Sequence, residues 1–223
     1  RTLRMNKGTV GLLIIFSLLL TGCSKDMTTI GFREISIEPK LIMTPVEKIP
    51  AGVGLFLSQE FRDYRYRIDH YGLGNIAHYQ GDIEIGNNTS LAFYQMMASL
   101  FSHVMIMEDY THQAKLAEGD IDFVAVPRIE RFDFKAPYTG LSNYEVRLAL
   151  GCTFYDRRGE TVVSTVKTTA KSIGALSALS GGGGPHEAVK KIVQDAVEDA
   201  LGEITRQVVA DRTKFRVSGH SGP

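Results

Sequence analysis

Hydrophobic and polar residues alternate along much of this chain, which is the pattern of strands with one buried and one exposed face. The longest such run covers residues 144–154, where every second position is apolar or aromatic. Shorter runs predict strand material over residues 51–68, 81–86, 103–107, 121–136 and 161–172. Residues 156–159, Asp-Arg-Arg-Gly, separate two of these runs and predict the turn of a hairpin.

Two further stretches have the periodicity of helices. Residues 89–102 predict a helix capped by Asn87 or Asn88. Its apolar stripe is formed by Leu91, Tyr94, Ala98 and Phe101 and is broadened by Met96, Met97 and Leu100. Residues 185–208 give the strongest helical pattern, with apolar positions repeating at i, i+3, i+4 and i+7 from Ala188 to Val208. Pro185 suits the first position of that helix. Each helix therefore presents one apolar face that can pack on a sheet.

The order of these elements predicts an α+β fold, with a mainly antiparallel sheet and two helices packed on one face. Pro127 interrupts the 121–136 run, and proline cannot donate to a strand ladder. This strand is therefore expected to lie at a sheet edge or to carry a bulge there. Cys152 lies within the apolar face of the 144–154 run, which predicts a buried side chain and not a nucleophile.

The first 23 residues have a different pattern. Arg4 and Lys7 precede an apolar run from Val10 to Leu20, which is typical of a secretory signal. This run is shorter than the roughly 20 apolar residues that a membrane-spanning helix needs. It ends in Leu20-Thr21-Gly22-Cys23, which resembles the lipobox of bacterial lipoprotein precursors.

That resemblance implies cleavage between Gly22 and Cys23. It also implies attachment of palmitate-like acyl chains to the Cys23 sulfur and to the new amino terminus. Ser24, and not aspartate, follows the cysteine. By resemblance to the known sorting pattern, this favours an outer-membrane, lipid-anchored and periplasm-facing location.

We therefore expect four segments. Residues 1–22 form the signal peptide, with residues 1–4 as an extension upstream of Met5. Residues 23–50 form the lipidated cysteine and a tether, because three prolines break any long element there. The alternation of Ile35, Ile37 and Leu41 allows one short strand or an extended arm within this tether. Residues 51–210 form the α+β domain, and residues 211–223 form a flexible tail.

Charge and cysteine content narrow the function classes. Removal of residues 1–22 takes away Arg1, Arg4 and Lys7, so the 25 basic and 25 acidic residues become 22 and 25, a net charge of −3. A slightly acidic protein lacks the basic excess that nucleic-acid binding needs. With Cys23 lipidated, Cys152 has no partner for a disulfide, so the apolar core must supply the stability.

The chain contains no sequence motif for a cofactor or a metal. His70 and His78 lie eight residues apart without nearby cysteines or a carboxylate cluster, so we predict no metal site. The glycines at 181–184 are followed by Pro185-His186-Glu187 and not by the lysine of a phosphate-binding loop. We therefore expect no cofactor.

These sequence features together favour a non-enzymatic binding or assembly subunit of an envelope complex. The element order is similar to that of small periplasmic transport and assembly lipoproteins such as the lipopolysaccharide-assembly lipoprotein LptE. Partner contacts are expected at the edge near Pro127, at the turn from Tyr138 to Leu141, and in the 175–184 segment with Leu176 and Leu179. A lipid or small-ligand binder and an envelope hydrolase are the alternatives, although no catalytic residues can be assigned.

Overall fold

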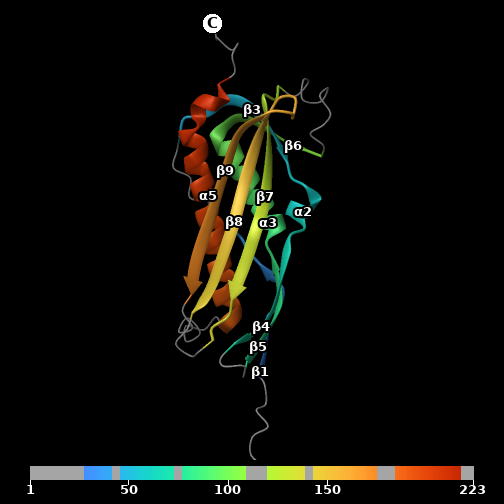
Figure 1. The fold of residues 1–223 in the computed structure, drawn as a ribbon, viewed down its shortest axis with the longest axis vertical. Coiled ribbons are helices and arrows are strands. Elements are labelled where there is room, and N and C mark those ends of the chain that lie inside the picture. The colour runs from blue at the N-terminus through green and yellow to red at the C-terminus, as the bar shows by residue number, and fades with distance from the viewer. Residues whose placement is uncertain are drawn as a thin grey trace, which may run out of the picture.

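The structure is a computed structural model that describes residues 28–41, 46–72, 77–108, 120–138, 143–174 and 184–216. The α+β class predicted from the sequence is confirmed. Figure 1 shows an elongated molecule in which strands and two long helices run close to the long axis. In chain order the elements are β1 Thr28–Gly31, β2 Ile35–Ser36, β3 Ile49–Phe56, α2 Gln59–Arg62, β4 Arg65–Gly72, β5 Ala77–Glu84, α3 Gly86–Leu100, β6 Phe101–Met107, β7 Phe123–Lys135, β8 Tyr144–Asp156, β9 Val162–Gly174, α5 Gly184–Ala210 and the 3-10 helix η2 Arg212–Phe215.

Two sheets form the framework, where we had expected one. The larger sheet has five strands in the order β6-β3-β7-β8-β9. Its long β7, β8 and β9 strands are antiparallel, whereas β3 lies parallel to both β6 and β7. In the smaller sheet β5 pairs antiparallel with β4 and parallel with the short β1 and β2. The longest ladders are therefore antiparallel, as predicted, and the parallel pairs are short additions.

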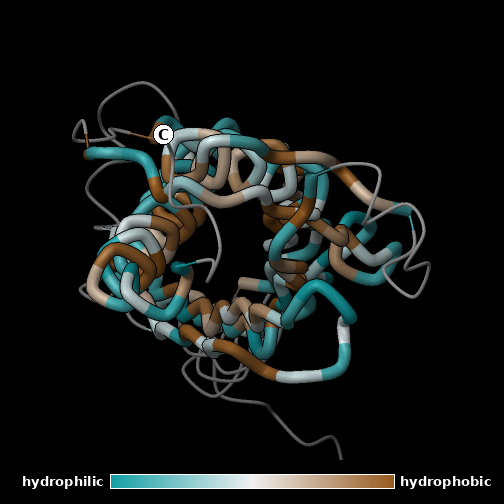
Figure 2. Tube along the Cα trace, turned by 90° about the horizontal axis from the view of Figure 1, so that it is seen from above, coloured by the Kyte–Doolittle hydropathy of each residue, from teal (hydrophilic) through white to brown (hydrophobic). Residues whose placement is uncertain are grey.

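The two long helices cover one face of the five-stranded sheet (Figure 1), as the sequence predicted. Helix α5 packs on β8 and β9, and α3 packs on β3 and β6. Viewed down the long axis, the elements surround a common interior (Figure 2). Every apolar residue expected on the α5 stripe is buried there: Ala188, Val189, Ile192, Val193, Ala196, Val197, Ala200, Leu201, Ile204 and Val208.

Helix α3 forms where expected, but its cap differs from the prediction and only part of the expected apolar stripe is buried. Ile85, and not Asn87 or Asn88, occupies the N-cap position, with no side-chain cap. The backbone N–H groups of Ile85 and Gly86 donate instead to the Tyr64 carbonyl oxygen at 3.1 and 3.0 Å. Met96, Met97 and Leu100 are buried as expected, together with Ala92 and Phe93, whereas Leu91 is 58% exposed. Packing of α3 against α2, β3 and β6 sets this orientation.

The folded part is larger than expected at its amino-terminal side. Residues 28–41 were predicted to belong to a tether, but β1 and β2 join the smaller sheet. Ile35 and Ile37 are fully buried in the main core. These two apolar side chains stabilise the segment against the body because their burial removes apolar surface from water.

The folded part also extends beyond residue 210. Phe215 is fully buried, and its ring meets those of Phe101, Phe123 and Phe154 at centroid distances of 5.5, 5.4 and 4.9 Å. The rings lie edge to face, which is a favoured arrangement of aromatic side chains. The described part of the expected tail is therefore packed on the core through one aromatic residue.

Candidate functional site

The edge of β7 is the first feature that could bind a partner. Strand β3 pairs with β7 only from Phe123 to Ala125. On that side, no other described strand pairs with residues 126–135 of β7, while β8 pairs with the opposite edge along nearly its whole length. Pro127 lies just after β3 departs, which agrees with the predicted edge position. The register shift is separate from it and falls between Ile129 and Arg131.

The part of β7 around Phe132 and Phe134 packs against β4. The Tyr66 ring lies 4.9 Å from that of Phe132, and the His70 ring lies 6.1 Å from that of Phe134. Tyr66 and His70 are further joined by a 3.0 Å hydrogen bond between the phenol oxygen and Nε2. The part of the edge around residues 126–129 borders a groove.

We call this depression the β7 groove, and its volume is about 320 Å³. Its walls come from the end of β3, from α2 and from β7, so it forms where β3 and β7 diverge. Its walls combine apolar and aromatic side chains with two charged groups. The lining residues are Phe56, Ser58, Glu60, Phe61, Tyr64, Val126, Arg128 and Ile129.

Helix α2 holds one wall of the groove in place. The Ser58 hydroxyl accepts a hydrogen bond from the Phe61 backbone N–H at 3.1 Å, which caps this short helix. The start of α3 lies directly against α2, because a Cβ on Gly86 would come within 2.3 Å of the Phe61 carbonyl oxygen. Only glycine fits that contact without a backbone shift. The glycine therefore allows α2 and α3 to fix the groove together.

The groove combines apolar walls with one phenol and two opposite charges. Among its described lining residues none is a histidine or a cysteine, and the Ser58 hydroxyl already caps α2. Burial raises the pKa of the Tyr64 phenol, with further contributions from Tyr66 and Asp133. Tyr64 therefore stays a neutral hydrogen-bonding group at physiological pH. Glu60 and Arg128 provide opposite charges that could orient a ligand.

The buried cysteine lies as the sequence predicted. Cys152 is 1% exposed, and its burial raises the pKa of the thiol far above its usual range, although a hydrogen bond with the Val126 backbone acts in the opposite direction. The thiol therefore stays protonated, and a thiolate nucleophile is not formed at neutral pH.

The two histidines of the β4–β5 hairpin lie in different environments. His78 is nearly buried, contacts Asp69 through Nε2 at 2.7 Å and stacks with Tyr71 at a centroid distance of 4.4 Å. The His78 hydrogen bond is the main cause that lowers the pKa of Asp69. His70 bonds to Tyr66. Among the described residues, no group of three or more potential metal ligands occurs.

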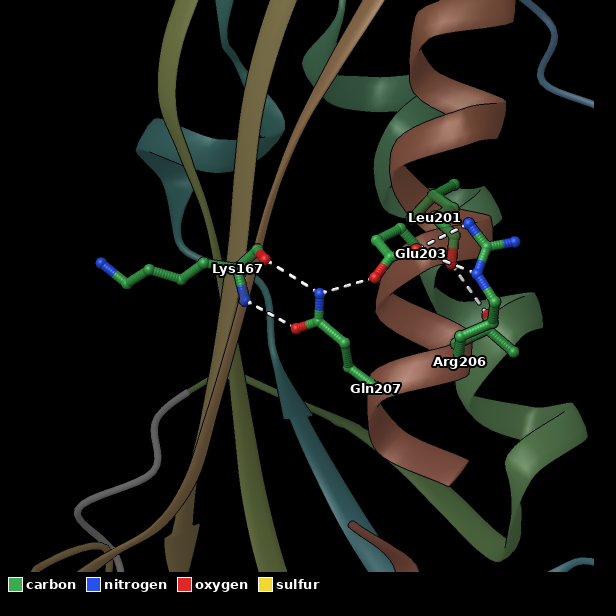
Figure 3. A network of polar contacts seen from close by, with 6 residues as sticks. Lys167, Leu201, Glu203, Arg206 and Gln207 are labelled. Atoms are coloured by element: carbon green, nitrogen blue, oxygen red, sulfur yellow. Dashed lines mark hydrogen bonds and ion pairs between the residues drawn. The ribbon is translucent and has the colours of Figure 1, made fainter. Parts of the chain in front are cut away.

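A second, polar groove of about 610 Å³ lies between β9 and α5, and Figure 3 shows its border. The Gln207 amide donates to the Lys167 carbonyl oxygen at 3.0 Å and accepts from the Lys167 N–H at 3.2 Å. Because β9 is the last strand of its sheet, Gln207 takes the place of a neighbouring strand. Its amide also donates to Glu203, which pairs with Arg206. We interpret this groove as the border along which α5 packs on β9, and not as a ligand site.

The structure separates the residues predicted to contact a partner. The Pro127 side chain is buried, so a partner at this edge would meet the neighbouring Arg128 and Ile129. Tyr138 is 62% exposed but lies beyond the far end of β7, about 35 Å from Pro127 at the usual rise of a strand. Leu141, Leu176, Leu179, Gly22 and Cys23 lie outside the described residues.

Sequence reasoning missed the α2 wall of the groove. Residues 51–68 were predicted to be strand material throughout, whereas α2 divides them into β3 and β4. The available signal was Ser58 followed by Glu60, since a serine N-cap and an acidic first turn mark a helix start. Four helical residues are too few to show a 3.6-residue period.

The described chain is thus an α+β domain with two sheets, two long helices and a groove at a free strand edge. No helix within the described ranges is both long and apolar enough to cross a bilayer. No protein-family model matches this sequence, and no curated protein sequence matches it either.

Several solved structures share part of the chain path. One is a Xanthomonas campestris protein of the DUF330 family, with 11% identity and a TM-score of 0.47, covering 79% of this chain and 98% of that one. Another is a minor lipoprotein from Acinetobacter baumannii, with 14% identity and a TM-score of 0.44, covering 74% of this chain and 96% of that one. These are partial similarities of shape, and we take no function from them.

Proposed function

We propose that this protein is an outer-membrane lipoprotein, anchored through Cys23 and facing the periplasm, that acts as a non-enzymatic binding or assembly subunit of an envelope complex. The anchor is supported by the basic start, the short apolar run and the lipobox-like residues from Leu20 to Cys23. Acyl chains add about 0.8 kcal/mol per buried methylene, so two or more of them give stable attachment.

The observation that carries the binding role is the β7 groove, which lies beside a stretch of strand edge that pairs with no other described strand. An exposed edge offers backbone N–H and C=O groups to an added strand, and an adjacent pocket gives side-chain specificity. Phe61 and Ile129 provide apolar walls, while Glu60 and Arg128 provide charge. We propose that an extended segment of a partner protein lies along residues 126–130 and inserts an apolar side chain into this groove.

Membrane tethering makes a small contact surface sufficient. Two proteins on one membrane meet at a raised effective concentration, so a modest affinity gives a stable assembly. A freely diffusing pair of proteins would need a larger interface to form a stable complex. A groove of about 320 Å³ is therefore sufficient for a partner on the same membrane.

One observation favours a second candidate, a small-ligand or lipid binder. The volume of the β7 groove lies at the lower end of the roughly 300–1,000 Å³ typical of small-molecule sites. Native mass spectrometry of protein extracted from membranes distinguishes the two, since a bound small molecule adds a discrete small mass.

Site-specific photo-cross-linking in the producing cells tests the partner role. We expect a cross-linker at Arg128 to yield one discrete protein adduct, whereas one at Lys191, on the exposed face of α5, yields none. The Glu60→Lys variant should weaken the Arg128 adduct, because it reverses a charge on the groove rim. Equal adducts at both positions, or an adduct insensitive to Glu60→Lys, would refute this role.

A further inference from the structure

Three exposed apolar or aromatic side chains gather at the end of the fold where β1 begins. Tyr71, Tyr138 and Ile173 are 56%, 62% and 54% exposed. Figure 1 shows that the ends of β4, β7 and β9 all lie at this end, opposite the end of α5. We call the surface formed by these three residues the β1 end.

Strand register confirms that these residues share one end. Thr28 pairs with Ala77, and Ala77 pairs with Gly72, the neighbour of Tyr71. A Cβ on Gly72 would come within 2.6 Å of the Pro137 carbonyl oxygen, and Pro137 precedes Tyr138.

Ile173 joins the same end through the larger sheet. It pairs with Glu145 of β8, and Glu145 also pairs with Lys135 at the end of β7. The two sheets therefore bring three separate segments to the point where β1 starts.

The position of β1 limits how far this end can lie from the anchor. Thr28 follows Cys23 by five residues. Since a fully extended chain spans at most about 3.6 Å per residue, the Thr28 Cα lies within about 18 Å of the Cys23 Cα. A cysteine with acyl chains in the bilayer stays at its surface. The β1 end must therefore remain close to the headgroups.

The exposed side chains suit a headgroup region. Tyrosine is enriched at membrane–water interfaces because its ring is apolar and its hydroxyl is polar. One face of the Tyr71 ring stacks on His78 with an interplanar angle of 8°, and His78 is itself held by Asp69. Tyr71 is therefore oriented by its neighbours while more than half of its surface is open.

We propose that the β1 end is a membrane-contact surface, in which Tyr71, Tyr138 and Ile173 lie in the headgroup region of the phospholipid bilayer that holds the acyl chains. This orientation rests on the proposed lipid anchor. It sets the long axis of the domain away from the bilayer and points the β8–β9 hairpin into the periplasm. The strands then act as a rigid spacer.

Fluorescence quenching on the acylated protein tests this orientation. The Tyr138→Cys and Ile173→Cys variants are each labelled with an environment-sensitive dye, and Val162→Cys is the matched control. Val162 is 54% exposed and lies at the other end of the 13-residue β9, about 35 Å from Ile173. Buried Cys152 does not compete for the dye.

The proteins are placed in vesicles of phosphatidylethanolamine and phosphatidylglycerol that contain lipids brominated on their acyl chains. Labels at 138 and 173 should lose about half of their fluorescence or more, since interfacial side chains lie roughly 5–10 Å into the boundary of headgroups and acyl chains. The label at 162 should lose none. Each protein also carrying Cys23→Ser, added to the same vesicles, gives the baseline.

The outcomes separate the orientation from the anchor. Acylated protein in which labels at 138 and 173 are quenched no more than the label at 162 would overturn the membrane contact and leave the anchor intact. An intact mass without acyl chains would overturn the anchor, and the orientation with it. Quenching at 138 and 173 alone supports the proposal.

Discussion

The Phe215→Ala substitution should destabilise the domain strongly, although this residue lies in a segment that the sequence suggested to be a flexible tail. The ring is fully buried and meets three phenylalanine rings at 4.9–5.5 Å. Removal of a buried phenylalanine side chain costs about 3–5 kcal/mol, because apolar burial is lost and a cavity remains. The total free energy of unfolding of a typical domain is only about 5–15 kcal/mol.

Urea unfolding of the protein without residues 1–23, followed by circular dichroism, measures this loss. The matched control is Arg216→Ala, since Arg216 is exposed and adjacent. It should change the free energy of unfolding by less than about 0.5 kcal/mol, as is usual for surface substitutions. A Phe215→Ala loss as small as that of the control would refute the packing of η2 on the core.

Three further predictions, made with four substitutions, test other parts of the fold. Gly86→Ala should cost about 1–3 kcal/mol, because its Cβ would meet the α2 backbone, whereas Gly202→Ala, with no atom within 4 Å of its Cβ, should stabilise α5 by up to about 1 kcal/mol; equal effects in urea unfolding would contradict this contrast. Gln207→Ala should cost about 0.5–1.5 kcal/mol and speed hydrogen exchange of the Lys167 amide; unchanged exchange would refute the edge contact. The Lys214 and Ser164 hydrogen bonds lower the pKa of Asp211 below its unfolded value, so their stabilising effect is present above about pH 4 and lost as the pH falls through the folded pKa. Asp211→Asn should therefore reduce the loss of unfolding free energy at low pH. An unchanged pH dependence would contradict this role of Asp211.

The elements with the clearest periodicity were predictable from sequence. The α5 stripe and the alternating β8 run each have one apolar face, so local pattern and tertiary burial agree. In α3 nearly every position from Leu91 to Met97 is apolar or small, so the pattern does not select the buried side. Contacts with β3, β6 and α2 select it.

Long-range pairing accounts for most of what the sequence did not indicate. Thr28 pairs with Ala77, 49 residues away, and nothing in the short β1 sequence specifies that partner. The β7 groove depends on β3 leaving β7 after Ala125, which is a matter of register and not of composition. Phe215 was a lone aromatic residue among charged neighbours, and its burial depends on three distant rings.

The central claim is that acyl chains on Cys23 hold this domain at a membrane. Intact mass spectrometry of the protein extracted from the membranes of producing cells tests it most directly. The account predicts a mature chain that begins at Cys23 and carries acyl mass on the cysteine sulfur and the amino terminus. A chain that still contains residues before Cys23, or a mature chain with an unmodified cysteine, would contradict it.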